Sequence, residues 1–151
     1  MSIRFEMTGV DDIKEKLERL AKPSKAKSIA RKALRQGANI VRDSARAKSK
    51  SIDDPKTKDK IFRNIAVEGG KSKRKDEVKL KVGVKGGASF SNPTPPSGGG
   101  GDTRHWRWIE FGSVHNVAIP FMRPALASNI QQVTDKFVQV FTAELDKELG
   151  I

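Results

Sequence analysis

His105, Glu110 and His115 carry the side chains best suited to hold a metal ion or to move a proton. We predict that residues 105–111 form a strand, in which successive side chains point to opposite faces. His105 and Glu110 would then point away from each other, and the three side chains would not converge. We therefore favour surface or packing roles for both histidines over a metal or acid/base site.

Other sequence signatures of catalysis are missing. The chain has no cysteine, which excludes disulfides and cysteine-based metal or redox sites. It has no glycine-rich phosphate loop between a strand and a helix, and no motif that places a serine beside a base. We therefore predict that the protein is not an enzyme and requires no cofactor.

Basic side chains are concentrated in the first half of the chain. Residues 1–85 carry 25 Lys and Arg against 12 Asp and Glu, whereas residues 86–151 carry 5 against 6, within a net charge of +12. At 100° per residue, five of these cations form one stripe on a helix predicted at residues 24–47. The stripe consists of Lys27, Arg31, Arg35, Arg42 and Arg46. It could face DNA, an acidic partner or a charged lumen, or it could simply be a solvated surface.

Trp106 and Trp108 could stack on nucleic-acid bases, but the sequence shows no base-reading helix-turn-helix, zinc finger or aromatic RNA platform. A tryptophan in an apolar strand lies more often in a core or an interface. Both faces of the predicted strand carry large apolar groups. We therefore expect Trp106 and Trp108 at a subunit contact or in the core, and keep a non-specific DNA-binding module as the alternative function.

The apolar pattern predicts one α+β domain over residues 1–151, a length typical of a single domain. A small, mostly antiparallel sheet would be packed by an N-terminal helix pair and a long C-terminal helix. In chain order we predict a strand at 2–7 and helices at 9–20 (capped by Thr8) and 24–47. A short helical turn at 57–63, strands at 65–67 and 78–84, the strand at 105–111, and a helix from Pro124 to Leu149 follow. Neither a signal peptide nor a membrane span is expected.

Residues 86–103 are rich in Gly, Pro and Ser and contain a single aromatic residue, Phe90. Such a segment cannot bury enough apolar surface to offset its ordering entropy. We predict a flexible loop inserted in the domain, and we favour a functional role because loops of this length are uncommon in compact domains.

Residues 106–126, WRWIEFGSVHNVAIPFMRPAL, combine an apolar segment, a Glu-Phe-Gly-Ser turn and a Pro-Phe-Met-Arg-Pro-Ala helix entry. This pattern resembles the tail-component family of siphophages, the gene-ten-like proteins of the lambdoid phage HK97, in which Thr and Leu are usual where this chain has Ser113 and Met122. The early helices also resemble that family, whereas residues 86–103 look like an insertion. The motif residues are Glu110, Phe111, Gly112, Pro120, Phe121, Arg123 and Pro124.

The resemblance implies a structural protein of the virion, assembled in the host cytoplasm, that acts at the neck or the head-proximal end of the tail. Its function would be tail completion and head–tail joining. Its partners would be other neck and tail proteins, such as the tail terminator and the head–tail connector, and it would form a homo-oligomeric ring, expected to be sixfold. Trp106, Trp108 and Phe137 are the candidate interface residues, and weak contact with the genomic DNA is a further expectation.

The motif also has a physical reading of its own. Gly112 allows a tight reversal, the two prolines fix the approach to the last helix, and Glu110 can accept hydrogen bonds from turn amides or pair with Arg123. We interpret it as a rigid corner and not as a catalytic site.

Overall fold

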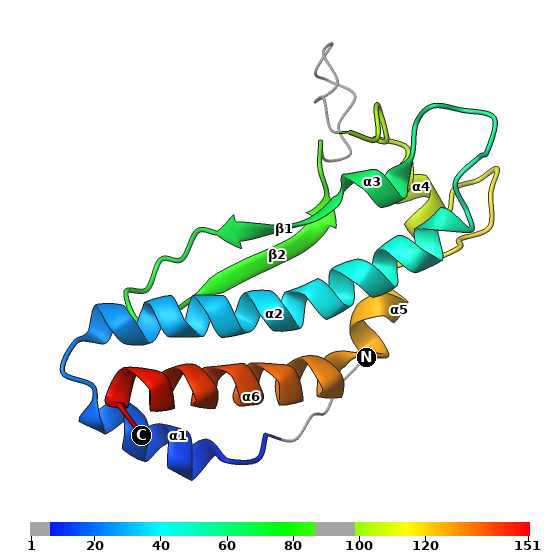
Figure 1. The fold of residues 1–151 in the computed structure, drawn as a ribbon. Coiled ribbons are helices and arrows are strands. Elements are labelled where there is room, and N and C mark those ends of the chain that lie inside the picture. The colour runs from blue at the N-terminus through cyan, green and yellow to red at the C-terminus, as the bar shows by residue number, and fades with distance from the viewer. Residues whose placement is uncertain (1–6, 87–98) are drawn as a thin grey trace. The chain divides into compact units, whose positions relative to one another are not determined.

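The computed structural model describes residues 7–86 and 99–151. These residues form α1 (Val10–Arg19), α2 (Pro23–Lys50), α3 (Ile61–Asn64), β1 (Ile65–Gly70), β2 (Lys79–Val84), α4 (Trp106–Phe111), α5 (Met122–Ala127) and α6 (Ile130–Leu149). β1 and β2 pair as a two-stranded antiparallel sheet (Figure 1). The predicted α+β class, with two N-terminal helices and a long C-terminal helix, is confirmed.

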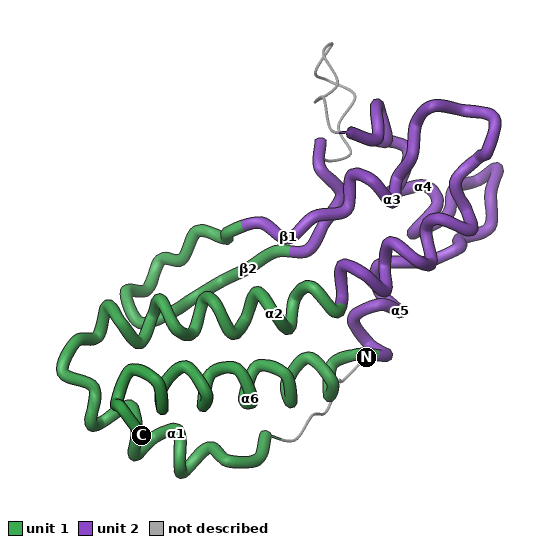
Figure 2. Tube along the Cα trace, viewed as in Figure 1, with its two compact units in different colours: residues 1–40, 69–81, 129–151 green, residues 41–68, 82–128 purple. Residues whose placement is uncertain are grey.

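The chain divides into two compact units, shown in Figure 2. Unit 1 contains residues 1–40, 69–81 and 129–151, and unit 2 contains residues 41–68 and 82–128. The helix α2 and both strands contribute residues to each unit.

The start and end of α1 follow from local chemistry. Asp11 and Asp12 lie in its first turn, and Lys16 and Arg19 in its last, so each charge complements the helix dipole. Gly9, with φ of 78°, is the N-cap residue in place of the predicted Thr8. Pro23 then occupies the first position of α2, where its fixed φ suits a helix and its missing N–H costs nothing.

In α2, every fourth residue from Ile29 to Ser49 is buried. The row comprises Ile29, Ala33 and Gly37 in unit 1 and Val41, Ala45 and Ser49 in unit 2. This row predominantly consists of small residues, so neighbouring elements can approach α2 closely. At Gly37 a side-chain Cβ would lie 3.0 Å from Val133 Cγ1 and 3.1 Å from the Val133 carbonyl oxygen, which shows how tightly α6 packs there.

The core of unit 1 lies among α1, α2 and α6. It contains Ile13, Ile29, Ala33, Phe141 and Leu145, with Phe137 and other half-buried apolar residues packed against it. The Phe137 and Phe141 rings stack with centroids 5.2 Å apart. Charged groups join the same helices at the surface: Lys16 pairs with Asp146 of α6 at 2.6 Å, and Lys32 of α2 pairs with Glu144 at 2.7 Å.

In unit 2, buried polar side chains hold short elements together. Asp53 caps α3, because its carboxylate accepts hydrogen bonds from the Ile61 and Phe62 N–H groups at 2.8 and 3.1 Å. The fully buried Asn64 accepts a hydrogen bond from the Gly100 N–H (2.9 Å) and donates to the Gly101 carbonyl (3.0 Å) and to the hydroxyl of Thr103 (2.7 Å). Residues 99–103, the described end of the predicted 86–103 loop, are therefore anchored, while residues 87–98 lie outside the described part.

Two predictions for the second half of the chain are wrong. Residues 106–111 form the helix α4 and not a strand. The Trp106 N–H donates to the Thr103 carbonyl and the Trp108 N–H to the His105 carbonyl, both at 3.0 Å, and these hydrogen bonds close helical turns. The predicted helix from Pro124 is broken at Ser128 and Asn129 into α5 and α6.

The remaining differences concern element ends. The helix α2 begins at Pro23 and continues to Lys50, three residues beyond the predicted end. The predicted turn at 57–63 is α3, shifted toward Asn64. The strand predicted at 2–7 falls mostly outside the described residues, and Met7, which is described, is not in a strand.

Candidate functional site

The best-connected polar side chain of the motif is Glu110, which is 1% exposed. One carboxylate oxygen accepts hydrogen bonds from the backbone N–H groups of Phe121 (2.7 Å) and Met122 (2.9 Å). The other accepts from the backbone N–H of Arg123 (3.0 Å) and from its Nε (3.1 Å). The guanidinium also donates to the Glu110 carbonyl at 2.7 Å, so α4 and the start of α5 are locked together.

These contacts determine the charge state of Glu110. Burial by itself would raise its pKa, but hydrogen bonds from the Met122, Arg123 and Phe121 amides and from the Arg123 side chain outweigh burial. The pKa of Glu110 is therefore lowered from its usual value of 4.5, and the side chain is ionised near neutral pH. Both contacts expected of Glu110, with turn amides and with Arg123, are present together.

The other motif residues surround this corner. Phe121 is fully buried, so it supports the fold of unit 2 and has no surface to offer a partner. Phe111 is 61% exposed, and the Arg123 guanidinium lies 4.9 Å from the centre of its ring. Pro124 lies within α5, and Pro120 is exposed at the end of the preceding loop.

Gly112 has φ of 77° and ψ of 174°, a backbone conformation essentially restricted to glycine. A Cβ at this position would lie 3.0 Å from the Ala118 nitrogen and 3.1 Å from the Asn116 oxygen. Gly112 thus redirects the chain after α4 into a loop, residues 112–119, that passes close to its own start.

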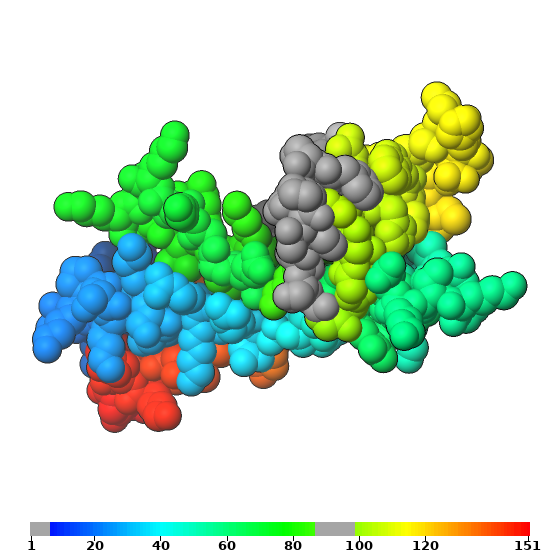
Figure 3. Space-filling model, turned by 90° about the horizontal axis from the view of Figure 1, so that it is seen from above, coloured from blue at the N-terminus to red at the C-terminus, as the bar shows by residue number. Residues whose placement is uncertain are grey.

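The 112–119 loop carries the most exposed large apolar side chains among the described residues. Val114 is 94% exposed and Val117 is 88% exposed. In the space-filling view, the yellow residues around this loop stand out at an edge of unit 2 (Figure 3). Sequence reasoning did not single this loop out, because its four apolar residues follow neither a helical nor a strand period.

Beside the loop lies a hollow of about 470 Å³ with mostly apolar side chains in its walls. Its walls are formed by residues of α4, of the loop and of the segment after α2: Ile52, His105, Trp108, Ile109, Asn116, Val117 and Ile119. Trp108 is 44% exposed at this hollow, whereas Trp106 is half-buried with its ring centre 6.5 Å from that of Phe111. Of the predicted interface residues, Phe137 lies in unit 1 and lines a separate hollow there with Met7, Leu34, Ile130 and Val133.

The five cations of the basic stripe differ in whether they have hydrogen-bond or ion-pair partners within the fold. Arg46 donates two hydrogen bonds, of 2.9 and 2.7 Å, to the carbonyl of Ile65, and Arg42 pairs with Asp43 at 2.8 Å. Lys27, Arg31 and Arg35, all in unit 1, take part in no ion pair among the described residues. Arg31 and Arg35 are exposed.

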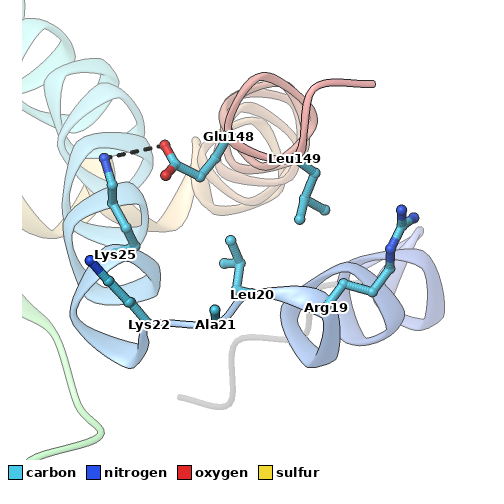
Figure 4. Close-up of a pocket in the computed structure, with 7 residues that line it drawn as sticks. All are labelled: Arg19, Leu20, Ala21, Lys22, Lys25, Glu148 and Leu149. Atoms are coloured by element: carbon cyan, nitrogen blue, oxygen red, sulfur yellow. Dashed lines mark ion pairs between the residues drawn. The ribbon is translucent and has the colours of Figure 1, made fainter.

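A second basic surface lies at the end of unit 1 where the α1–α2 connection meets the end of α6 (Figure 4). This hollow of about 380 Å³ is lined by Arg19, Lys22 and Lys25, among other residues. Lys25 is already paired with Glu148 at 3.2 Å, and Arg19 points away from the hollow in the close-up. The arrangement joins helices and does not gather its cations around one point.

His105, Glu110 and His115 are not brought together as a metal site. No group of three potential ligand side chains among the described residues is close enough to hold a metal ion. The Glu110 carboxylate is occupied by four N–H donors and serves the fold. Within the described residues, no helix combines the length and apolarity required to cross a bilayer.

The fold and the site define a small α+β protein in which a buried carboxylate fixes a corner beside an exposed apolar loop. Residues 11–112 match the family model described as "Bacteriophage HK97-gp10, putative tail-component". Because this match spans more than half of the chain, the protein belongs to the HK97 gp10-like family of phage tail components. Comparisons with curated proteins and with solved structures gave no match.

The family predicted from residues 106–126 is thus confirmed. The matched region runs from α1 to Gly112, so it contains the Glu-Phe-Gly part of the motif. The Pro-Phe-Met-Arg-Pro part lies beyond it, where Glu110 connects the two parts through hydrogen bonds.

Proposed function

We propose that this tail component acts at the neck or the head-proximal end of the tail, where it completes the tail and joins it to the head. It works by contact with neighbouring subunits, as a homo-oligomeric ring expected to be sixfold. Its partners are other neck and tail proteins, such as the tail terminator and the head–tail connector, and it resides in the virion.

The observation that carries this proposal is the pairing of a rigid corner with an exposed apolar loop. The Glu110 carboxylate, with four N–H donors, fixes the residues that follow the loop, and Gly112 adopts the backbone conformation that turns the chain from α4 into the loop. Large apolar side chains exposed on a rigid support are typical of protein–protein contacts, because little entropy is lost on binding. A ring contact of this kind should bury about 800 Å² per partner.

The test is electron microscopy of particles made by a phage that lacks this gene. We expect filled heads and completed tail tubes that remain separate, and we expect the wild-type gene supplied in trans to restore joined particles. Intact, infectious particles without the protein would refute the proposal. A block before heads or tails are built would move the function to an earlier assembly step.

Weak contact with genomic DNA is a second candidate function, favoured by the exposed cations of α2. The half-buried Lys27 and the exposed Arg31 and Arg35 recur every four residues and therefore lie on one face of the helix. With roughly three phosphate contacts, the affinity for duplex DNA should fall about fortyfold between about 50 and about 200 mM salt.

Fluorescence anisotropy with two unrelated duplexes measures this salt dependence. Arg31→Ala combined with Arg35→Ala should weaken binding equally for both duplexes, and Arg74→Ala, an exposed cation in a different segment, is the matched control. Tight binding to one sequence at physiological salt would instead favour a DNA-binding regulator over a structural component.

A further inference from the structure

Exposed apolar side chains are concentrated in one short stretch of unit 2. Nine large apolar residues of the described chain are exposed, and six of them lie between residues 108 and 126. These six are Trp108, Phe111, Val114, Val117, Ile119 and Leu126. Trp108, Val117 and Ile119 line one hollow and so share a surface. Exposed apolar residues that serve no contact are usually scattered, so this concentration indicates a contact surface.

The 112–119 loop, which carries Val114, Val117 and Ile119, is held by hydrogen bonds at its tip and at its base. At its tip the Ser113 N–H donates to the Asn116 carbonyl at 2.9 Å, and the Ser113 hydroxyl accepts from the His115 and Asn116 N–H groups at 3.1 and 3.2 Å. At its base the Ile119 N–H donates to the Ile109 carbonyl at 2.7 Å. Val114 and Val117 are therefore presented on an ordered turn.

The same unit offers a hollow into which such a turn could insert. The hollow of about 470 Å³ lies beside the base of the loop, and Val114 at the loop tip is not one of the residues that line it. One unit therefore carries a projecting apolar tip at Val114 and, beside it, a recess whose walls include Asn116, Val117 and Ile119 of the same loop. When the tip of one copy enters the recess of the next, the contact is heterologous (head-to-tail), and such contacts form a ring where the rotation between copies closes.

Charge indicates which partner fits. The chain carries a net charge of +12, so two copies repel wherever their basic surfaces meet. Residues 111–122 contain no Lys, Arg, Asp or Glu, and neither does the lining of the hollow. Arg107 of α4 and Arg123, whose guanidinium lies beside Phe111, are the neighbouring cations. A partner selected by opposite charge would use the basic surfaces, whereas the uncharged tip and recess let a second copy of the same chain bind without opposing like charges at the contact itself.

We propose that the 112–119 loop of one subunit inserts into the hollow of the next copy and that this contact builds the ring. The inference rests on the proposed function as a ring and adds the residues that make the subunit contact. Val114 is the tip residue, and Ile52 and Trp108 line the recess that receives it.

Because the natural chain lacks cysteine, disulfide cross-linking reports this contact without background. Two variants, Val114→Cys with an affinity tag and Ile52→Cys without one, are supplied together to the phage lacking this gene, and purified particles are oxidised. We expect mixed dimers in which Val114→Cys of one copy is linked to Ile52→Cys of another. The control replaces Val114→Cys with Ser24→Cys, an exposed position in unit 1, and the yield of mixed dimers should then be several-fold lower. The dimers are identified by mass spectrometry.

Two cross-linking results would overturn the inference. Dimers linking Val114→Cys only to itself would indicate a two-fold contact that does not build a ring. A link from Val114→Cys to a different particle protein would assign the loop to another partner.

A second measurement separates this inference from the proposed function. Val114→Asp combined with Val117→Asp should leave the thermal midpoint of the purified chain unchanged, because both side chains are exposed, but should reduce incorporation into particles to background. Ile151→Asp, another exposed apolar position, should be incorporated normally. Normal incorporation of the double variant would refute the loop contact but would leave the neck function standing. Absence of the wild-type chain from particles would refute the neck function itself.

Discussion

At the scale of single residues, Glu110 explains why the corner is rigid. A carboxylate that accepts several N–H donors in a buried site is costly to replace, because each donor left without an acceptor loses its hydrogen bond and stays out of water. The negative charge also lies where the first N–H groups of α5 point, which favours it further.

Glu110→Gln tests this account. The amide cannot accept all four donors, so the free energy of unfolding at pH 7 should fall by about 2–4 kcal/mol. Chemical denaturation followed by tryptophan fluorescence measures the change. Glu148→Gln, in an exposed ion pair with Lys25, should change stability by less than about 1 kcal/mol.

The pH dependence of the same variant follows from the lowered pKa of Glu110. A carboxyl whose pKa is lower in the folded than in the unfolded state contributes stability that is fully present above its unfolded pKa and is lost as pH falls through the folded pKa. The gap in unfolding free energy between wild type and Glu110→Gln should therefore be constant above the usual value of 4.5 and shrink below it. A gap that grows on acidification would contradict this assignment.

Gly112 provides the other fixed point of the corner. Gly112→Ala places a Cβ in a conformation that favours glycine and close to backbone atoms of residues 116 and 118, so it should cost about 1–3 kcal/mol. The control is Gly69→Ala, where a Cβ meets nothing within 4 Å. Equal melting temperatures for the two variants would show that the 112–119 loop is not constrained as described.

At the scale of elements, the close approach of α2 and α6 depends on the small residues of α2. Gly37→Leu must push α6 away at Val133, whose backbone oxygen cannot move independently of the helix. Overpacking of this kind costs about 1–3 kcal/mol. Thermal unfolding should show a lower midpoint for Gly37→Leu and little change for Gln36→Leu on the exposed side of the same helix; an unchanged midpoint for Gly37→Leu would mean that the contact is loose.

The sequence predicted elements well where one period dominates. Both N-terminal helices and the strands β1 and β2 were expected from helical or alternating apolar spacing, and the structure confirms them. The contacts of Glu110 with the amides and with Arg123 could be anticipated because the acid precedes a proline-flanked helix entry.

The segment 106–111 could not be assigned from spacing, because a run of six residues with apolar groups on every face fits either period. Its helical form depends on contacts distant in sequence, chiefly those of Glu110 with residues 121–123. The break at Ser128 and Asn129 was hidden for a related reason, since the spacing from Leu126 to Ile130 is the same as in one continuous helix. The anchoring of residues 99–103 by Asn64 also has no local signal, because the partners are more than thirty residues apart.

At the scale of the whole molecule, the chain combines cations on α2 with an exposed apolar surface at the 112–119 loop, which contains no Lys, Arg, Asp or Glu. Apolar contacts supply most of the favourable free energy of association, whereas charge determines partner choice and the rate of encounter. A protein that bridges a ring of its own copies and a different neighbour requires both kinds of surface. Membership in a family of phage tail components agrees with surfaces that serve contacts with other proteins.

The most direct test of the joining function uses heads and tails that were made without this protein. Extracts from cells infected by the phage lacking this gene are mixed with the purified wild-type chain, and infectious particles are counted. The account predicts that the wild-type chain raises the titre by joining pre-made heads and tails, whereas the Val114→Asp, Val117→Asp variant does not. Heads and tails that join equally well without any added protein would contradict it.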